Sequence, residues 1–384
     1  MNIKFKPTHI FNGTALLPTG QVLILNPQGV VQDIVAASEA GENVQELGGW
    51  LCPGFVNAHC HIELSHLRGK IAKHTGLPGF VEQVINGRTA ELDTIEDAME
   101  AAANELYESG TVAVGDICNT THSIRLKLNS PLYWHNFIEV SGFVDATARV
   151  RLGTSQAVLD VFKAAGFENN SSLSPHAPYS VSRTLFQLIN ERTAGKIISI
   201  HNQETAAENE LYESGTGDFL ALYDQLGIDI SGFKPTGASS LQSWIAAFNN
   251  HQQIISVHNT FTSEADVDAA KNIGFFCICI NANEYIEKTI PPLLLLQQAE
   301  RMMVVGTDSY ASNDSLNVWN ELQTIRKHFP TIPLEILLQW ATSNGAAALN
   351  ISDRFGSFEK GKKPGLVLID TVDNTVSVPH RFHA

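Results

Sequence analysis

The sequence contains no apolar stretch that could span a bilayer, and basic residues are few for its size. The densest apolar runs, Phe275–Ile280 and Leu293–Leu296, fall far short of the roughly 18 residues of a membrane helix. The start of the chain carries positive charge without an apolar run behind it, so no secretory signal is expected. With 25 Lys and Arg against 40 Asp and Glu, the net charge is −15, which opposes binding to nucleic acid and anionic lipid. A small-molecule substrate is the partner that these features leave open.

Cysteine is also scarce, because five residues, an odd number, are spread over 384 positions. Four of the five stand in apolar or strand-like surroundings, where cysteine usually acts as a small buried hydrophobe. We therefore expect a protein of the reducing cytoplasm. The sequence does not determine the oligomeric state, and a homodimer is compatible with it.

Short strands broken by turns occupy both ends of the chain. Gly, Pro and Asn separate them, a pattern typical of a small antiparallel β unit. We expect the strands near the end to return and complete the unit begun by the first fifty residues. The expected strands are Thr8–Phe11, Gln21–Leu25 and Val30–Val35 at the start, one strand after a turn within 361–370, and one at 375–378.

Between residues 53 and 350, short apolar strands alternate with longer helical stretches, the signature of repeated βα units and a parallel sheet. Amphipathic helices are expected at Thr94–Gly110, Val181–Thr193 and Leu334–Leu349. Eight such strands fit an α/β fold, the (β/α)8 TIM barrel. The expected strands are Phe55–Ala58, Thr111–Ile117, Tyr133–Val140, Ser172–Ser174, Ile197–His201, Ile254–His258, Phe275–Ile280 and Met302–Gly306.

Histidine or aspartate stands at the end of five of these strands. In a TIM barrel the chemistry gathers at the C-terminal ends of the strands, so these residues are candidates for one shared site. They are His59 and His61 after strand one, His176 after strand four, His201 after strand five, His258 after strand six and Asp308 after strand eight. His176, between two prolines, either binds substrate at the barrel mouth or belongs to a turn of no chemical interest.

His59 and His61 are two residues apart on an extended segment, so their side chains point to the same side and can bind one metal ion. His201 and Asp308 would supply a third and a fourth ligand. Imidazoles with a carboxylate suit zinc, or iron in some settings, better than magnesium or calcium. Taken singly, His201 could be a satisfied core histidine and Asp308 a helix N-cap. Chance is a poor explanation for such residues at five strand ends.

Glu204 follows the strand-five histidine by three residues, and its carboxylate can return over the metal if the chain turns into a helix there. A carboxylate beside an activated water is the usual proton shuttle. The alternative is a helix-start glutamate stabilised by the helix dipole, which is the role expected of Glu208 and Glu210. His258 could hydrogen-bond the attacking hydroxide or an oxyanion.

Together these motifs resemble the amidohydrolase superfamily, most closely its cytosine, guanine and adenosyl-nucleoside deaminase and chlorohydrolase branch. The resemblance covers almost the whole chain, and it is carried by Pro53–His61, Ser174–Tyr179, His201–Glu204, Val257–His258 and Gly306–Asn313. It implies a distorted TIM barrel of residues 53–350 and a small β-sandwich domain built from both termini, residues 1–52 plus 351–384.

The resemblance also implies roles for individual residues. Glu204 would carry the shuttle role, His258 would polarise, and Asp308 would also accept the nucleophile's proton. One divalent metal per chain, zinc or else iron, would be held by His59, His61, His201 and Asp308.

Two departures from the family pattern matter. Binuclear members place a carbamylated lysine at the end of strand four, where this chain has His176 and no lysine between Lys163 and Lys196. This favours a single metal ion. The segment Cys279–Tyr285 replaces a Cys-Pro-x-Ser-Asn stretch that many relatives have, and that loop helps to shape the pocket. This loop therefore gives no basis for assigning the substrate by analogy with those relatives.

The segment His61–Ser65 followed by Gly79–Arg88 is similar to the branch of this family that deaminates aminodeoxyfutalosine. Glu63 could contact sugar hydroxyls, and Arg68 and Arg88 could meet a substrate carboxylate. The structural alternative is a solvated pair of Glu63 and Arg68, with Arg88 on a helix surface.

The leading hypothesis is a hydrolytic deaminase in which a metal-bound hydroxide attacks an amino-bearing ring carbon of an adenine-type nucleoside derivative and releases ammonia. Aminodeoxyfutalosine is the best single substrate. Hydrolysis of a cyclic amide or a carbon–halogen bond, and deamination of guanine or cytosine, are the alternatives with the same site. A barrel that binds without turnover would be expected to lack a metal ligand or Glu204, and all are present.

Overall fold

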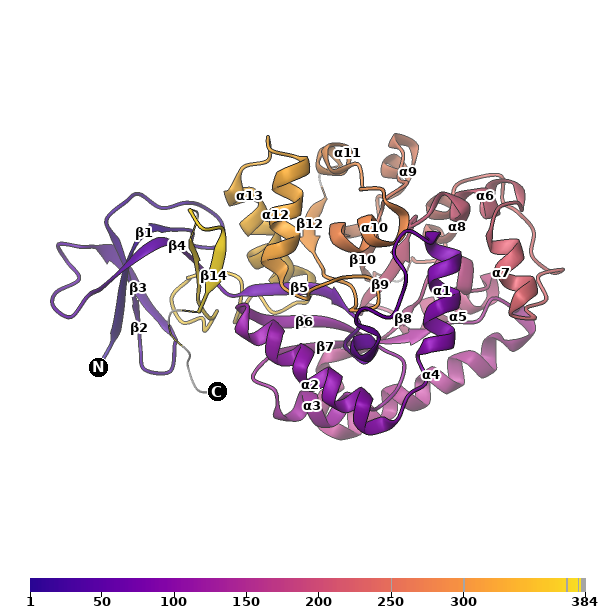
Figure 1. The fold of residues 1–384 in the computed structure, drawn as a ribbon, viewed down its shortest axis with the longest axis horizontal. Coiled ribbons are helices and arrows are strands. Elements are labelled where there is room, and N and C mark those ends of the chain that lie inside the picture. The colour runs from indigo at the N-terminus through magenta and orange to yellow at the C-terminus, as the bar shows by residue number, and fades with distance from the viewer. Residues whose placement is uncertain (250, 300, 371, 379, 381–384) are drawn as a thin grey trace.

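The computed structural model describes the chain except residues 250, 300, 371, 379 and 381–384, and the described strands form three sheets (Figure 1). Two four-stranded parallel sheets lie in the larger, helix-rich part of the molecule. A six-stranded sheet, with strands from both the first and the last parts of the chain, forms a smaller lobe at one end. Within the described residues, no helix combines the length and the apolar character needed to cross a membrane.

The eight parallel strands that the sequence predicted are present in the larger part, divided between two sheets. One sheet has the order β5-β6-β7-β8 and the other β12-β11-β10-β9, all parallel. The sheets meet at two seams: the N–H of His201 donates to the carbonyl of His176 at 2.9 Å, and the N–H of Thr307 donates to the carbonyl of His59 at 3.0 Å. The strands are β5 (Phe55–Cys60), β6 (Thr111–Cys118), β7 (Tyr133–Val140), β8 (Ser171–Pro175), β9 (Ile197–Asn202), β10 (Gln253–His258), β11 (Ile273–Ile278) and β12 (Met302–Val305).

Helices surround these strands (Figure 1). The α-helices are α1 (Gly76–Gly87), α2 (Leu92–Glu108), α3 (Ile124–Asn129), α4 (Ala148–Phe162), α5 (Arg183–Arg192), α6 (Ala206–Ser214), α7 (Phe219–Gln225), α8 (Ser240–Ile245), α9 (Glu264–Ala269), α10 (Ile280–Glu287), α11 (Leu293–Gln298), α12 (Val318–His328), α13 (Leu334–Gln339) and α14 (Gly345–Ala348). Shorter helical turns are η1 (Ile62–Leu67), η2 (Asp145–Thr147), η3 (Lys163–Phe167), η4 (Glu168–Asn170), η5 (Pro178–Ser180) and η6 (Trp340–Asn344).

The predicted helices are present, with shifted or broken bounds. α2 begins and ends two residues before the prediction and buries Ile95, Met99 and Leu106 on one face. The helix predicted over 334–349 is divided into α13, η6 and α14, with a π turn at η6. There the hydroxyl of Thr342 donates to the carbonyl of Leu338 at 2.6 Å, a bond that competes with regular helix geometry.

The smaller lobe combines strands from both ends of the chain, as expected. Its strands, in the order β14-β13-β4-β1-β2-β3, form one sheet in the described residues, where the resemblance implied a sandwich. The sequence patterns missed β4, because Gly48 and Gly49 resemble a turn. Gly49 has a φ of 85° and passes close to the carbonyl of Ile369. The strands are β1 (Ile3–Ile10), β2 (Gln21–Leu25), β3 (Val31–Ala36), β4 (Gln45–Cys52), β13 (Val367–Asp370) and β14 (Thr375–Ser377).

β4 leads directly into β5, so the lobe is attached at the start of the first barrel strand. Apolar side chains from both parallel sheets pack together, among them Val56, Phe137, Ile255 and Val304, all fully buried. Such a packed interior confines the chemistry to the strand ends. The division into folding units of residues 1–52 plus 351–384 and 53–350 stays a prediction.

Gly306 tests the β12–β5 seam, because a Cβ there would lie 2.8 Å from the Cβ and carbonyl oxygen of His59 and 3.0 Å from Sγ of Cys277. We expect Gly306→Ala to lower the free energy of unfolding by about 1–3 kcal/mol, the usual cost of overpacking. Denaturant unfolding checks this. The matched control is Gly274→Ala in β11, whose Cβ would meet nothing closer than 3.7 Å. An equal loss in both variants would contradict the tight seam.

Candidate active site and metal centre

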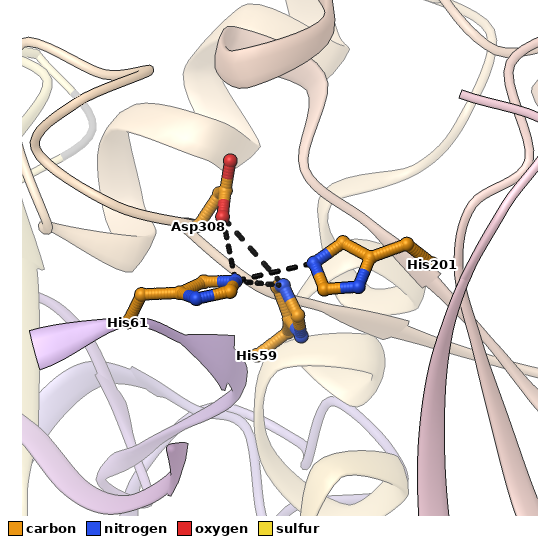
Figure 2. Close-up of side chains that lie close together, drawn as sticks. All are labelled: His59, His61, His201 and Asp308. Atoms are coloured by element: carbon orange, nitrogen blue, oxygen red, sulfur yellow. Dashed lines mark hydrogen bonds and ion pairs between the residues drawn. The ribbon is translucent and has the colours of Figure 1, made fainter. Parts of the chain in front are cut away.

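Three histidines and one aspartate from three strand ends meet at one point (Figure 2). Nε2 of His61 lies 3.1 Å from Nε2 of His59 and 3.2 Å from Nε2 of His201. Oδ1 of Asp308 lies 3.3 Å from Nε2 of His61 and 3.6 Å from Nε2 of His59. The structure therefore brings together all four residues that the sequence singled out as candidate metal ligands.

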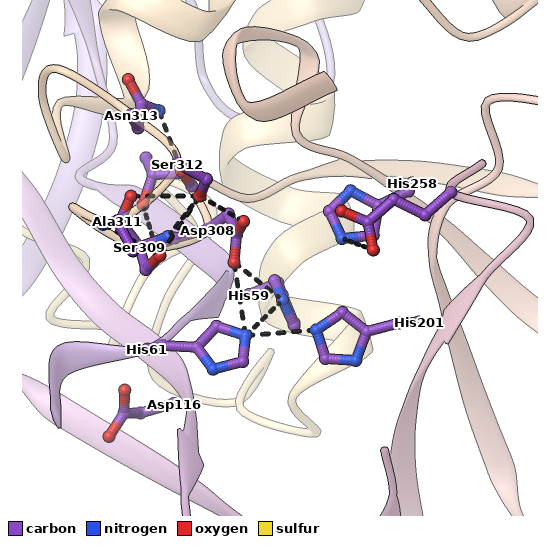
Figure 3. Close-up of polar contacts among 12 residues, drawn as sticks. His59, His61, Asp116, His201, His258, Asp308, Ser309, Ala311, Ser312 and Asn313 are labelled. Carbon is purple, nitrogen blue, oxygen red and sulfur yellow. Dashed lines mark hydrogen bonds and ion pairs between the residues drawn. The ribbon is translucent and has the colours of Figure 1, made fainter. Parts of the chain in front are cut away.

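The local backbone explains this convergence. His59 and His61 alternate with Cys60 at the end of β5, so both imidazoles point to the same side, toward His201 and Asp308. Asp308 has a left-handed φ of 57°, and its N–H donates to the carbonyl of His59 at 3.1 Å. The hydroxyl of Ser312 donates to Oδ2 of Asp308 at 2.5 Å (Figure 3). This bond leaves Oδ1 of the carboxylate to face the imidazoles.

The protonation of the site favours a bound cation. Burial lowers the pKa of His61 to about 4 and that of His201 to about 3, so both imidazoles are neutral at pH 7. Nδ1 of His201 donates its proton to the carbonyl of His176 at 2.8 Å, and its Nε2 therefore presents a lone pair to the site. Although burial opposes ionisation of Asp308, the neighbouring imidazoles hold the pKa of its carboxyl well below the usual range.

The spacing of these atoms also fits a metal ion. Ligand bonds of about 2.0–2.2 Å at tetrahedral angles would place the four ligand atoms about 3.3–3.6 Å apart. Four of the six separations are 3.1 to 3.6 Å, and all four ligand atoms lie within 4.8 Å of one another. Lone pairs that face one another at this distance repel, and a cation between them removes the repulsion. The donor set of three imidazole nitrogens and one carboxylate oxygen is the kind that zinc or iron takes.

Glu204 and His258 lie beside this centre, as the sequence suggested. Nε2 of His258 is 3.6 Å from Oε2 of Glu204, and both side chains are buried. Burial, and next the charge of Asp308, raises the pKa of the Glu204 carboxyl well above its usual range. Nδ2 of Asn283, from the segment expected to shape the pocket, lies 3.2 Å from Nδ1 of His258. In this orientation the amide donates to Nδ1, and Nε2 of His258 carries the proton toward Glu204.

A cavity of about 670 Å³ opens over the centre. Its floor is polar and includes His61, His201, Glu204 and Asp308. Its walls are mostly apolar and come from α1, α7 and the segment after β7; they include Leu77, Phe80, Val84, Phe143, Leu222 and Tyr223. Ligand sites commonly combine an apolar wall with a few convergent polar groups. The volume and the walls suit a ligand considerably larger than a free nucleobase.

Three of the four residues expected to contact substrate line this cavity: Glu63, Arg88 and His176. Burial raises the pKa of Glu63 to about 7. Its carboxylate accepts hydrogen bonds from the N–H groups of Asn119 and Thr120, so it anchors the loop after β6 and is not the solvated side chain of the structural alternative.

Arg68, the fourth, does not line the cavity. Its guanidinium donates to Glu105 at 3.4 Å and to the carbonyl of Asp314 at 3.0 Å, and it lies over the ring of Tyr310. These contacts tie the segment after η1 to the loop after β12. The sequence could not show that Arg88 lines the cavity and Arg68 does not. The direction of the Arg68 side chain depends on the path of the chain after η1, which no sequence pattern indicates.

Three charged residues of the cavity were missed: Glu139, Arg151 and Asp229. Glu139, near the end of β7, lies 4.0 Å from Nε2 of His176 through its Oε2. Its place beside the C-terminal end of a predicted strand is a sequence feature that could have identified Glu139. Arg151 of α4 lines the cavity edge, and its side chain lies close to Gly142, where a Cβ would come within 2.6 Å of Cγ of Arg151. No motif or periodicity in the sequence distinguishes Arg151 from the other arginines of the chain.

The model of the Amidohydrolase family matches residues 50–382 of the chain. Aminodeoxyfutalosine deaminase of Nitratiruptor sp. is 25% identical over 385 residues, covering 92% of this chain and 91% of that protein. Adenosine deaminase of Helicobacter pylori is 27% identical over 328 residues, covering 82% of this chain and 78% of that protein.

Solved structures show the same fold. The crystal structure of Helicobacter pylori aminofutalosine deaminase in complex with methylthio-coformycin superposes with a TM-score of 0.80 at 24% identity, covering 96% of this chain and 92% of that chain. An adenosine deaminase from Xanthomonas campestris with bound zinc has a TM-score of 0.72 at 21% identity, covering 96% of this chain and 84% of that chain.

Proposed function

The chain belongs to the amidohydrolase family, and we propose that it is a metal-dependent hydrolytic deaminase that releases ammonia from an adenine-type nucleoside derivative. The observation that carries the proposal is the convergence of three neutral imidazoles and one carboxylate with a buried glutamate beside them. Relatives over most of the chain are named as deaminases of aminodeoxyfutalosine, adenosine and 5'-deoxyadenosine, which supports this substrate class.

The metal would be held by His59, His61, His201 and Asp308 as one ion per chain, zinc or else iron. Bound there, it would lower the pKa of a water molecule and so supply a nucleophile near neutral pH. A second group of possible ligands, Glu139 with His176 and His201, shares its third member with the first. Since Nδ1 of His201 is bonded to a carbonyl and its Nε2 faces the first site, this geometry supports a single ion.

The protein side chains would move the protons. Burial and the charge of Asp308 raise the pKa of the Glu204 carboxyl, which favours its protonated form, so it can donate to a ring nitrogen as water adds to the adjacent carbon. The carboxylate that results can take a proton from the added water and pass it to the departing amine, which leaves as ammonia. The Nε2–H of His258 points to the same region and would orient the attacking oxygen. Asp308 would be a second acceptor for the proton of that oxygen.

The cavity supports a substrate that is longer than adenosine. The apolar walls from α1 and α7 would pack against an apolar extension at the ribose 5' position. Arg88 and Arg151 both line the cavity, and Arg88 donates to Oδ1 of Asn119 at 3.0 Å. A carboxylate at the end of the extension could pair with either guanidinium. Glu63 and His176 would contact the sugar hydroxyls. Aminodeoxyfutalosine, which carries such an acid, is the best single candidate.

The metal proposal predicts that zinc-loaded protein contains about one tightly held ion per chain. His59→Ala and Asp308→Ala should lose it, because each removes one of the four ligand atoms. Elemental analysis after gel filtration measures the content. His122→Ala, at an exposed histidine, is the control and should keep the ion. Two tightly held ions per wild-type chain would overturn the single-ion site.

The proton-shuttle proposal predicts that Glu204→Gln keeps the fold and the metal content and lowers kcat by about 10²–10⁴-fold. The amide has nearly the same shape but cannot exchange a proton with the ring. Steady-state kinetics with ammonia detection gives the rate. A variant with unchanged kcat and normal metal content would show that Glu204 is only a helix-start residue.

The substrate proposal predicts that the acid, aminodeoxyfutalosine, is a better substrate than its amide or than adenosine. Arg88→Ala and Arg151→Ala should raise KM for the acid by about 10-fold or more and leave KM for the amide nearly unchanged, because only the acid has a charge to lose. Arg149→Ala, exposed on the same helix as Arg151, is the control. Equal kcat/KM on all three compounds, or activity on guanine or cytosine alone, would reject this substrate.

A further inference from the structure

Glu208 lies in the first turn of α6, yet it has no exposed surface. The sequence suggested a helix-start carboxylate that is stabilised by the helix dipole. In the structure, Oε1 of Glu208 accepts a hydrogen bond from the N–H of Gln203 at 2.8 Å and a short one from the hydroxyl of Ser240. Oε2 has no partner among the described residues. A buried carboxylate is costly unless its bonds hold something in place, and here the bonded group is the loop that follows β9.

Gln203 stands directly before Glu204, and its backbone is left-handed, with a φ of 47°. L-residues rarely adopt this conformation, so the surroundings must maintain it. The side chain of Gln203 is held from three directions. Its Nε2 donates to Oδ1 of Asn209 at 3.1 Å and to Oδ2 of Asp266 at 3.0 Å, and its Oε1 accepts from the hydroxyl of Thr262 at 2.7 Å.

Glu208 itself does not line the cavity over the metal centre. It therefore cannot touch a substrate bound there, and any effect on the reaction must pass through the loop. The residue on the other side of the Gln203 bend is Glu204, whose Oε2 lies 3.6 Å from Nε2 of His258. A rotation at Gln203 would swing this carboxyl away from His258. An offset of about 1 Å in a catalytic group can lower a rate about 100-fold.

We propose that Glu208 is a positioning residue for Glu204. Its carboxylate holds the N–H of Gln203 and thereby fixes the left-handed bend that directs the Glu204 carboxyl over the centre. The inference rests on the proposed function, because it takes Glu204 as the proton shuttle. It adds a residue of α6 that acts on kcat without contacting the substrate or the metal ligands.

The experiment compares three single variants in the full-length, zinc-loaded protein. Glu208→Leu has a similar volume but no acceptor, and we expect kcat to fall about 10–100-fold, with KM and metal content unchanged. Glu208→Gln keeps an acceptor oxygen for the Gln203 N–H and should recover most of the rate. Glu213→Leu, an exposed position on the same helix, is the matched control and should match wild type. A purely structural role would instead raise KM, reduce metal content and lower Tm together.

A double-mutant cycle with Glu204→Gln gives the sharper test. If Glu208 acts through Glu204, Glu204→Gln with Glu208→Leu should be no slower than Glu204→Gln alone. Losses that multiply would overturn the proposal. If Glu208→Leu does not fold, Ser240→Ala, which removes the other donor to Glu208, takes its place. It should lower kcat severalfold in the wild-type background and leave the Glu204→Gln background unchanged, and any other pattern counts against the proposal.

The two hypotheses fail differently in this design. A normal kcat for Glu204→Gln would reject the shuttle, and with it the basis of the inference. A slow Glu204→Gln variant beside a Glu208→Leu variant of normal kcat would reject the role of Glu208 and leave the proposed deaminase mechanism standing. Metal content and Tm, measured on every variant, separate both results from a loss of the centre.

Discussion

The close approach of three imidazole nitrogens and one carboxylate oxygen is the constraint on which the rest of the site depends. His59 and His61 come from the sheet that contains β5, whereas His201 and Asp308 belong to the sheet that ends in β12. The two sheets are joined at their seams by few backbone hydrogen bonds, including those to the carbonyls of His59 and His176. A divalent cation at the common point would offset the charge of Asp308 and also link the two sheets.

Buried carboxylates hold the loops around this centre. Oδ1 of Asp116 accepts from the N–H of Ile62 after β5, and Glu63 in turn accepts from backbone N–H groups after β6. Glu208 holds the loop after β9, and Glu321 accepts from the N–H of Asn281 after β11. Each of these acids satisfies a donor that the end of a strand leaves unpaired. Part of the acidic excess of the sequence is thus buried around the strand ends and supports the site.

The sequence was most informative where chemistry and periodicity coincide. Alternation along β5 was enough to pair His59 with His61, and the other ligands could be found because parallel strands end at the same face. It was least informative about side chains whose direction depends on a loop or helix. Arg68 leaves the cavity and Arg151 enters it, and no local pattern distinguishes them. β4 was missed because its glycine pair resembles a turn, although only glycine fits beside Ile369 there.

The hydrogen bond from Nδ2 of Asn57 to the hydroxyl of Thr307 joins residues that are 250 positions apart. Asn57 is in the first barrel strand, and Thr307 directly follows the last one. During synthesis, the edge of β5 that faces β12 therefore stays unpaired until β12 has left the ribosome. Such long-range closure slows folding and exposes a strand edge to other chains meanwhile. Until the last strand has been made, the chain is in this sense an open sheet.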